Sequence, residues 1–169
     1  MAIRTTAILN LKGGVAKTTT AINMAAILAK DHSKRVLLID ADSQCNTTEF
    51  FGADPEGDTL STVLRDAPQY ESPEAMAVLA IQATRYEGVD IIPADDSLMD
   101  LDLSSVAQGT VSTNVLRYLV EAVKNQYDYV LIDCPPAFNA AAAAALVAAD
   151  DVIIPIKLDA FSLRGMANL

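Results

Sequence analysis

Five short segments of the chain are almost continuously apolar, and these segments predict strands. Most of them consist of Val, Ile and Leu with few polar residues between, and they lie at residues 4–10, 35–39, 89–92, 129–132 and 152–156. A strand with one solvated face alternates apolar and polar residues, whereas a strand covered on both faces does not. The pattern therefore favours a parallel sheet that is buried on both faces.

Stretches of helical character separate these strands and follow the last one. They lie at residues 17–30, 73–84, 97–107, 113–125, 140–149 and 161–168. Strands that alternate with helices form right-handed crossover units. We therefore expect one domain, an open α/β sheet with helices on both faces, with surface loops at residues 52–57 and 65–74, where Gly, Pro, Asp and Ser collect.

Composition excludes several broad classes of protein. Hydrophobic residues make up 51% of the chain and charged residues 20%, which excludes general disorder. The longest apolar run, residues 140–149, is far shorter than the roughly 20 residues of a membrane-spanning helix. Two cysteines cannot form a disulfide framework, so a reducing cytoplasm is expected. The net charge of -10, with 12 scattered basic residues, argues against broad attraction to DNA or anionic lipid.

The residues after the first strand have the features of a phosphate-binding loop. Ligands of such sheets bind beyond the carboxyl ends of the strands. Gly13 and Gly14 permit close approach of the backbone to an anion, and the helix that follows supplies N–H donors. Lys17 can place its ammonium on the outer phosphates, and the Thr18 hydroxyl can ligate a bridging magnesium ion. The alternative for the two glycines is a plain strand-to-helix turn.

The ordinary P-loop pattern is not matched, because its two glycines fall at Leu11 and Ala16. An extra lysine precedes the glycine pair instead. In this respect the loop resembles the deviant Walker A loop of the ParA/MinD ATPases. The resemblance implies a P-loop NTPase-type (Rossmann-like) α/β fold, a three-layer sandwich with a mostly parallel central sheet, of which the C-terminal part is missing here. The resemblance implies that the nucleotide contacts Lys12, Gly13, Gly14, Val15, Ala16, Lys17, Thr18 and Thr19.

Three further motifs resemble this family in the same order along the chain. Residues 38–48 are similar to its second acidic motif, with Ser43 and Cys45 in place of the usual proline and glycine, so a different loop shape is expected. Residues 131–136 are similar to the ParA form of Walker B. Residues 152–165 continue the pattern, with Asp159 where the family often has Glu.

The resemblance implies a role for each carboxylate of these motifs. Asp133 would hold magnesium through water, and Asp42 would orient the attacking water. Asp40 is a further candidate for magnesium. The alternatives are ordinary: Asp133 can cap a helix or end a strand in solvent, and Asp40 and Asp42 can both form a turn.

Lys12 has two interpretations. It could be an exposed charge in front of the glycine loop. The resemblance implies instead that it crosses into the partner's site in an ATP sandwich dimer, where it acts as an arginine finger does. Ala16, commonly glycine in the family, puts a methyl group close to the same phosphates, and its small size should be tolerated.

The function that the resemblance implies is an ATPase switch for partition of plasmid or chromosomal DNA. Its cofactors would be ATP and magnesium, and an ATP-dependent homodimer would bind non-specific DNA. A ParB-like partner would stimulate slow hydrolysis at the nucleoid, in the bacterial cytoplasm. Family members are usually longer, so the 169 residues are expected to cover about two-thirds of the domain. The DNA surface would lie mainly in the remainder, so this chain alone should fold without binding DNA in an ATP-dependent way.

The alternative is a MinD-like ATPase that cycles on membranes and places the cell-division site. Its distinguishing feature is a basic amphipathic C-terminal helix, and this chain ends too early to show one. An iron–sulfur carrier is disfavoured because no Cys-x-x-Cys occurs. A non-catalytic scaffold is disfavoured because all of the following are present: Lys12, Lys17, Thr18, Asp42 and Asp133.

The remaining features of the sequence need no function. The alanines at 140–145 allow a helix to pack close to the sheet, and Cys134 is expected to be a small core residue. A solvated helix end and its caps explain His32, Asp90, Asp95, Asp96, Asp100 and Asp102.

Overall fold

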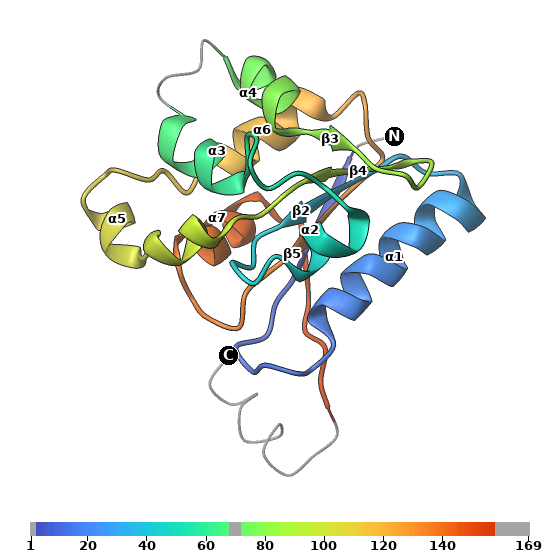
Figure 1. Cartoon of the computed structure of the whole chain (residues 1–169), viewed down its shortest axis with the longest axis horizontal. Helices are drawn as coiled ribbons and strands as arrows, with labels where there is room; N and C mark the ends of the chain where they lie inside the picture. Colours follow the sequence, from blue (N-terminus) through green and yellow to red (C-terminus); the bar gives the residue numbers. More distant parts are fainter. Residues whose placement is uncertain (1–2, 68–71, 158–169) are drawn as a thin grey trace.

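The computed structural model of the chain describes residues 3–67 and 72–157. These residues form three layers, a central sheet with helices on each face (Figure 1). The strand order within these residues is β3-β4-β2-β5-β1-β6. Every pairing is parallel except β3 with β4, which confirms the prediction of a mostly parallel sheet. The strands are β1 (Arg4–Ile8), β2 (Val36–Asp40), β3 (Gln82–Ala83), β4 (Val89–Ile92), β5 (Tyr129–Asp133) and β6 (Asp151–Ile153).

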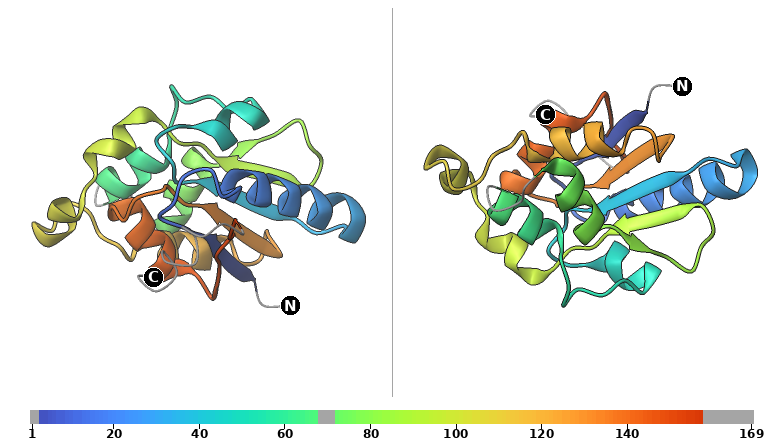
Figure 2. Two further views of the ribbon diagram at one scale, coloured as in Figure 1. Left: turned by 90° about the horizontal axis from the view of Figure 1, so that it is seen from below. Right: turned by 90° about the horizontal axis from the view of Figure 1, so that it is seen from above.

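Helices cover both faces of the sheet, as Figure 2 shows from two sides. One face packs against α1 (Lys17–His32) and α2 (Asn46–Phe51). The opposite face packs against α3 (Leu60–Asp66), α4 (Pro73–Ala80), α6 (Val115–Val123) and α7 (Ala140–Ala148). Successive residues of β2 alternate between the two cores, and all of them are buried. The continuous apolar pattern therefore has the predicted cause, burial on both faces.

Several predicted elements differ from the structure. The helix predicted over residues 73–84 ends at Ala80, because the chain turns to pair β3 with β4. Gln82 fixes this turn by exchanging two hydrogen bonds with the backbone of Asp54. The helix predicted over 97–107 is two pieces, the 3-10 helix η2 (Asp96–Asp100) and α5 (Leu103–Ala107). The break occurs where the Asp102 carboxylate caps the start of α5.

Two short helices, α2 and α3, were not predicted. α2 begins after a left-handed turn at Cys45, and a reciprocal hydrogen-bonded cap between Thr59 and Thr62 starts α3. The helix predicted over residues 161–168 and the family position Asp159 lie outside the described residues.

The expectations for alanine and cysteine are confirmed, and the expectation of aspartate caps holds for Asp95 and Asp102. It is wrong for Asp90, which lies in β4 and accepts a hydrogen bond from the Tyr127 hydroxyl at 2.8 Å. The alanines of α7 that pack against the sheet are fully buried, and their small side chains allow a close approach. Cys134 is fully buried as well, and burial raises the pKa of its thiol to about 12. Asp95 caps η2 just as Asp102 caps α5. These groups therefore serve the fold.

Candidate functional site

The sheet brings three sequence motifs to one edge. Asp133, the last residue of β5, is level with Ile8 at the end of β1 and with Asp40 at the end of β2. The loops that follow these three strands therefore begin side by side at the carboxyl edge. This is the edge at which ligands of open parallel sheets bind.

The loop between β1 and α1 has room for an anion. Gly14 has a φ of +69°, a left-handed conformation that glycine adopts without cost. A Cβ atom added at either Gly13 or Gly14 would meet no atom within 4 Å, so open space lies beside the backbone here. No side chain caps the start of α1. The first N–H groups of the helix therefore remain as donors for a phosphate.

Two residues that stand in place of family glycines have left-handed backbone. Ala16, the residue before α1, has φ 68° and ψ 30°, and Cys45, the residue before α2, has φ 55° and ψ 23°. In this region the Cβ atom of an L residue crowds the following carbonyl oxygen. Glycine is usual at both positions for a physical reason, and this chain keeps the backbone conformation without it.

The two lysines of the loop are held differently. Lys17 is 7% exposed, and its Nζ atom donates to the backbone carbonyl of Lys12 at 3.4 Å, under the loop. The backbone N–H of Lys12, a half-buried residue, donates to Asn10 Oδ1 at 2.9 Å. Asn10 in turn donates from Nδ2 to the Pro155 carbonyl at 2.9 Å. Asn10 thus ties the phosphate loop to the segment after β6.

Asp133 carries the clearest sign of a missing partner. It is 1% exposed, and its Oδ2 accepts from the Thr47 hydroxyl at 2.7 Å. Its Oδ1 is the buried side-chain oxygen without a hydrogen bond among the described residues. Burial raises the pKa of this carboxyl, and the nearby Thr47 and Thr18 hydroxyls and the Lys17 charge oppose that rise. A hydrated magnesium ion between Thr18 and Asp133 would satisfy the open oxygen, so these residues fit the metal.

Asp40 already uses both of its carboxylate oxygens. Oδ2 accepts from the backbone N–H and the hydroxyl of Thr48 at 2.8 and 2.7 Å, and Oδ1 accepts from the backbone N–H of Asp42 at 3.2 Å. The residue is fully buried, and this burial raises the pKa of the carboxyl to about 7. These contacts favour a role in positioning α2 and the Asp42 loop. Direct ligation of magnesium by Asp40 stays a prediction.

Asp42 lies in the loop after β2, close to Asp133. Its charge contributes to the raised pKa of Asp133, and its Oδ1 accepts from the Gln44 backbone N–H at 3.1 Å. Asp42 is nearly buried, at 9% exposed. In the described part of the chain, no three His, Cys, Asp or Glu residues are arranged to hold a metal ion.

Sequence reasoning missed three residues of this site. Asn10 organises the phosphate loop, Thr47 holds Asp133, and Thr48 holds Asp40. Each had a signal in the sequence. Asn10 is a polar residue at the end of the first apolar run, and two consecutive threonines end the acidic motif.

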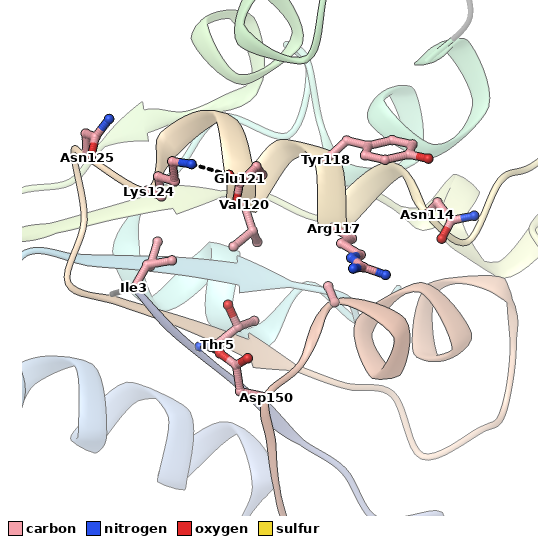
Figure 3. Close-up of a pocket in the computed structure, with 11 residues that line it drawn as sticks. Ile3, Thr5, Asn114, Arg117, Tyr118, Val120, Glu121, Lys124, Asn125 and Asp150 are labelled. Atoms are coloured by element: carbon pink, nitrogen blue, oxygen red, sulfur yellow. Dashed lines mark hydrogen bonds and ion pairs between the residues drawn. The ribbon is translucent and has the colours of Figure 1, made fainter. Parts of the chain in front are cut away.

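Two hollows of the molecule lie away from these loops. One, of about 690 Å³, is lined by residues of α6 with Ile3 and Thr5 at the start of β1 and Asp150 before β6 (Figure 3). The other, of about 770 Å³, lies at the end of α1. None of the described residues that line either hollow is a predicted site residue. The predicted chemistry is therefore at the carboxyl edge and not in these hollows.

The fold and the site define a class of protein. A parallel sheet carries a glycine loop before its first helix, a buried lysine in that loop and an acidic strand end beside it. This is the arrangement of P-loop NTPases.

Comparisons with known proteins identify the family within this class. A family model described as "AAA domain", AAA_31, matches residues 3–169. The sporulation initiation inhibitor protein Soj of Bacillus subtilis is 40% identical over 167 residues, which cover 96% of this chain and 62% of that protein. The chromosome partitioning protein ParA of Caulobacter vibrioides is 41% identical over 171 residues, 99% of this chain and 61% of that one. The chain belongs to the ParA/Soj-like ATPase family, which confirms the resemblance seen in the sequence.

Solved structures agree with this assignment. Apo McdA from Cyanothece superposes with a TM-score of 0.83 at 30% identity, covering 98% of this chain and 63% of that one. Cobyrinic acid a,c-diamide synthase from Mycobacterium smegmatis, bound to an ATP analogue and magnesium, gives a TM-score of 0.78 at 31% identity, covering 98% and 68%. The chain thus spans less than two-thirds of the Soj, ParA and McdA proteins that it matches.

Proposed function

We propose that this chain is the nucleotide-binding part of an ATP-driven switch for partition of plasmid or chromosomal DNA. The observation that carries the proposal is the buried, unpartnered Oδ1 of Asp133, which lies near Thr18 at the base of an open glycine loop. A carboxylate oxygen in this position needs a partner, and hydrated magnesium on a nucleotide phosphate supplies one. The name of one relative, the chromosome partitioning protein ParA of Caulobacter vibrioides, supports the biological role.

Binding of the nucleotide and its magnesium would use the loop backbone and three side chains. Backbone N–H groups of residues 13–19 would surround the phosphates, and the Lys17 ammonium would offset their charge. Thr18 and Asp133 would hold magnesium, Thr18 through its hydroxyl and Asp133 through water. Magnesium supplies positive charge that polarises the phosphoryl oxygens. The hydrogen bond from Thr47 keeps the Asp133 carboxylate aimed at this position.

Hydrolysis would depend on Asp42 and on a second copy of the protein. Asp42 would orient a water molecule for in-line attack on the terminal phosphorus, and the bond to the ADP oxygen would break. The Lys12 ammonium would reach the partner's phosphates in an ATP-dependent homodimer, and the partner's lysine would reach this site. The lysine would then place positive charge where negative charge develops in the transition state. Turnover would therefore be slow until the dimer closes.

In the cell, the closed dimer would hold non-specific DNA at the nucleoid in the bacterial cytoplasm. A ParB-like partner would stimulate hydrolysis and so release the dimer. No helix within the described ranges is long and apolar enough to cross a membrane. The name of the chromosome partitioning protein ParA among the relatives favours this role over a cycle on membranes.

Three variants test the proposal by separating its steps. Lys17→Ala should abolish ATP binding in calorimetry, because it removes the buried ammonium of the loop. In a protein of the relatives' length, Lys12→Ala should bind ATP but neither dimerise in light scattering nor release phosphate. Asp42→Ala should form an ATP dimer that persists, because only the water loses its acceptor. Lys124→Ala, on the surface of α6, is the matched control and should behave as the wild type.

Each variant has a result that contradicts its assignment. Unchanged ATP affinity in Lys17→Ala would remove the phosphate-loop assignment. Normal ATP-dependent dimers and turnover in Lys12→Ala would make that residue an ordinary surface lysine. Normal phosphate release by Asp42→Ala would move the water-positioning role to another residue, with Asp40 as the next candidate.

A further inference from the structure

A cleft of about 770 Å³ lies at the end of the molecule opposite the phosphate loop. It is formed by the last turns of α1 and the loop between β3 and β4, which lie side by side in Figure 1. We refer to it as the amino-edge cleft, since it adjoins the first residues of β2 and β4. Its lining includes Ala29, Lys30, Lys34, Arg35, Tyr86 and Val89. The 16 residues of α1 separate it from the phosphate loop by roughly 24 Å.

Positive charge gathers at this cleft, although the sequence suggests scattered basic residues. Lys30, Lys34 and Arg35 line it, and Arg85 lies beside it over the ring of Tyr86, at 5.1 Å from the ring centroid. Four of the 12 Lys and Arg residues of the chain are therefore close together. This is a local exception in a chain whose net charge is -10.

Neither lysine of the cleft forms a close ion pair with a carboxylate in the described part of the chain. Asp128 lies near Lys34, and its pKa is lowered by the hydrogen bond from the Arg35 backbone N–H and by the charges of Lys34 and Arg35. The Arg35 guanidinium, by contrast, donates to the Asn125 carbonyl at 3.2 Å. Glu87 carries the one carboxylate among the described residues that line the cleft.

Exposed aromatic rings flank the basic residues. Tyr86 stacks on Phe50 with ring centroids 5.9 Å apart, and Phe51 meets Tyr86 edge-on at 5.3 Å. Phe50 and Tyr86 are 44% and 37% exposed, whereas Phe51 is only 4% exposed. Tyrosine and arginine are the residue types that dominate binding energy in protein interfaces. The cluster therefore has the composition of a binding surface.

The loop that carries Tyr86 is fixed against α1. Gly88 has a φ of +82°, and a Cβ atom there would meet Ala29 Cβ and the Lys34 carbonyl oxygen, each at 3.2 Å. The Gly88 carbonyl also accepts from the Val36 backbone N–H at 2.8 Å. The cleft is thus formed before any ligand binds, which reduces the ordering cost of association.

We propose that the amino-edge cleft binds an acidic peptide segment of a partner protein. An apolar or aromatic side chain of the segment enters between Ala29, Tyr86 and Val89, and its carboxylates meet Lys30 and Lys34. Charge complementarity selects this occupant, because the remaining surface repels acidic chains and the cleft attracts them. Duplex DNA fits less well. It presents phosphates but no apolar side chain for the floor of the cleft.

Selection of displayed random peptides on the 169-residue protein tests this proposal. The library is first depleted on the double variant Lys30→Glu, Lys34→Glu, whose fold is checked by its melting temperature. The enriched peptides should carry Asp or Glu on both sides of an apolar or aromatic residue. A fluorescein-labelled synthetic copy of an enriched peptide should bind the wild type in anisotropy titrations. Its affinity for the double variant should be lower by about tenfold or more.

Two further variants separate the parts of the cleft. Tyr86→Ala should weaken the peptide as well, because the floor loses its ring. Lys124→Glu, a charge reversal of the same kind outside the cleft, should leave peptide binding unchanged. ATP affinity should be the same in all of these proteins, so failure of the cleft and failure of the nucleotide site are distinguishable.

Several outcomes would overturn the proposal. No enrichment, enrichment without acidic residues, or equal binding to the double variant would each exclude an acidic peptide. Binding of a labelled DNA duplex that the double variant loses, with no peptide enriched, would assign the surface to nucleic acid. Self-association in sedimentation that the double variant abolishes would assign it to a second copy of the chain.

Discussion

Replacement of Ala16 by glycine should make the protein more stable, although it removes a methyl group from the start of its longest described helix. Ala16 has φ 68° and ψ 30°, a conformation that costs an L residue about 1–2 kcal/mol and costs glycine almost nothing. Part of this stabilisation is lost, because glycine increases the conformational freedom of the unfolded chain, which costs roughly 0.4–1 kcal/mol of stability. The net gain is therefore about 0.5–1 kcal/mol.

Thermal unfolding followed by circular dichroism measures this gain. For a domain of this size, 1 kcal/mol shifts the melting temperature by about 2–4 °C, so Ala16→Gly should raise it by about 1–4 °C. Cys45→Gly should give a smaller gain. Its backbone is also left-handed, but the substitution loses a half-buried side chain whose thiol donates to the Ser43 carbonyl.

Ala26→Gly is the matched control within the same helix. Ala26 is exposed in the interior of α1, where glycine costs about 1 kcal/mol relative to alanine. The two alanine-to-glycine changes should therefore have opposite signs. If Ala16→Gly lowered the melting temperature as Ala26→Gly does, the left-handed backbone at position 16 would not be strained, and the reasoning would fail.

Three further outcomes follow from the site. Burial raises the pKa of Asp40 from 3.8 to about 7, so between about pH 4 and 7 the folded apo protein binds a proton that the unfolded chain does not. The free energy of unfolding should therefore fall as the pH rises through this window. In denaturant titrations, Asp40→Asn should make the free energy of unfolding less dependent on pH there. Thr47→Val leaves the buried Asp133 carboxylate without its hydroxyl donor and should cost about 1–3 kcal/mol in the same assay, more without magnesium than with it. Saturating magnesium and ATP should stabilise the wild type by about 2.7 kcal/mol at a hundred times the Kd, and the same nucleotide should not stabilise Lys17→Ala; equal stabilisation of both would contradict the role of the loop lysine.

The sheet and the phosphate loop could be predicted from sequence because their signals are local. Strands buried on both faces leave continuous apolar runs, and the loop motif lies within a few residues of the chain. The parallel arrangement then predicts that Asp133 ends beside the loop without any knowledge of side chains. The observed register, which pairs Asp133 with Ile8 and with Asp40, agrees with this reasoning.

The elements that were missed depend on contacts between distant residues. β3 forms because Gln82 and Ala83 pair with β4 and Gln82 forms hydrogen bonds with the backbone of Asp54. A strand of two residues has no local sequence pattern that predicts it. Asn10 acts through Pro155, which lies 145 residues further along the chain. Such contacts form only once the fold is in place, so the sequence indicates polar residues at the site but not their partners.

The two threonines of α2, Thr47 and Thr48, hold the carboxylates of Asp133 and Asp40 in place through hydrogen bonds. Thr47 donates to Asp133 at the end of β5, and Thr48 donates to Asp40 at the end of β2. The Thr48 hydroxyl also accepts from the Ala94 backbone N–H just after β4, at 2.8 Å. One turn of helix thus joins the ends of three neighbouring strands. Because both threonines are almost fully buried, a shift of α2 would break several unsolvated hydrogen bonds at once, and the position of Asp133 is therefore coupled to the packing of the sheet.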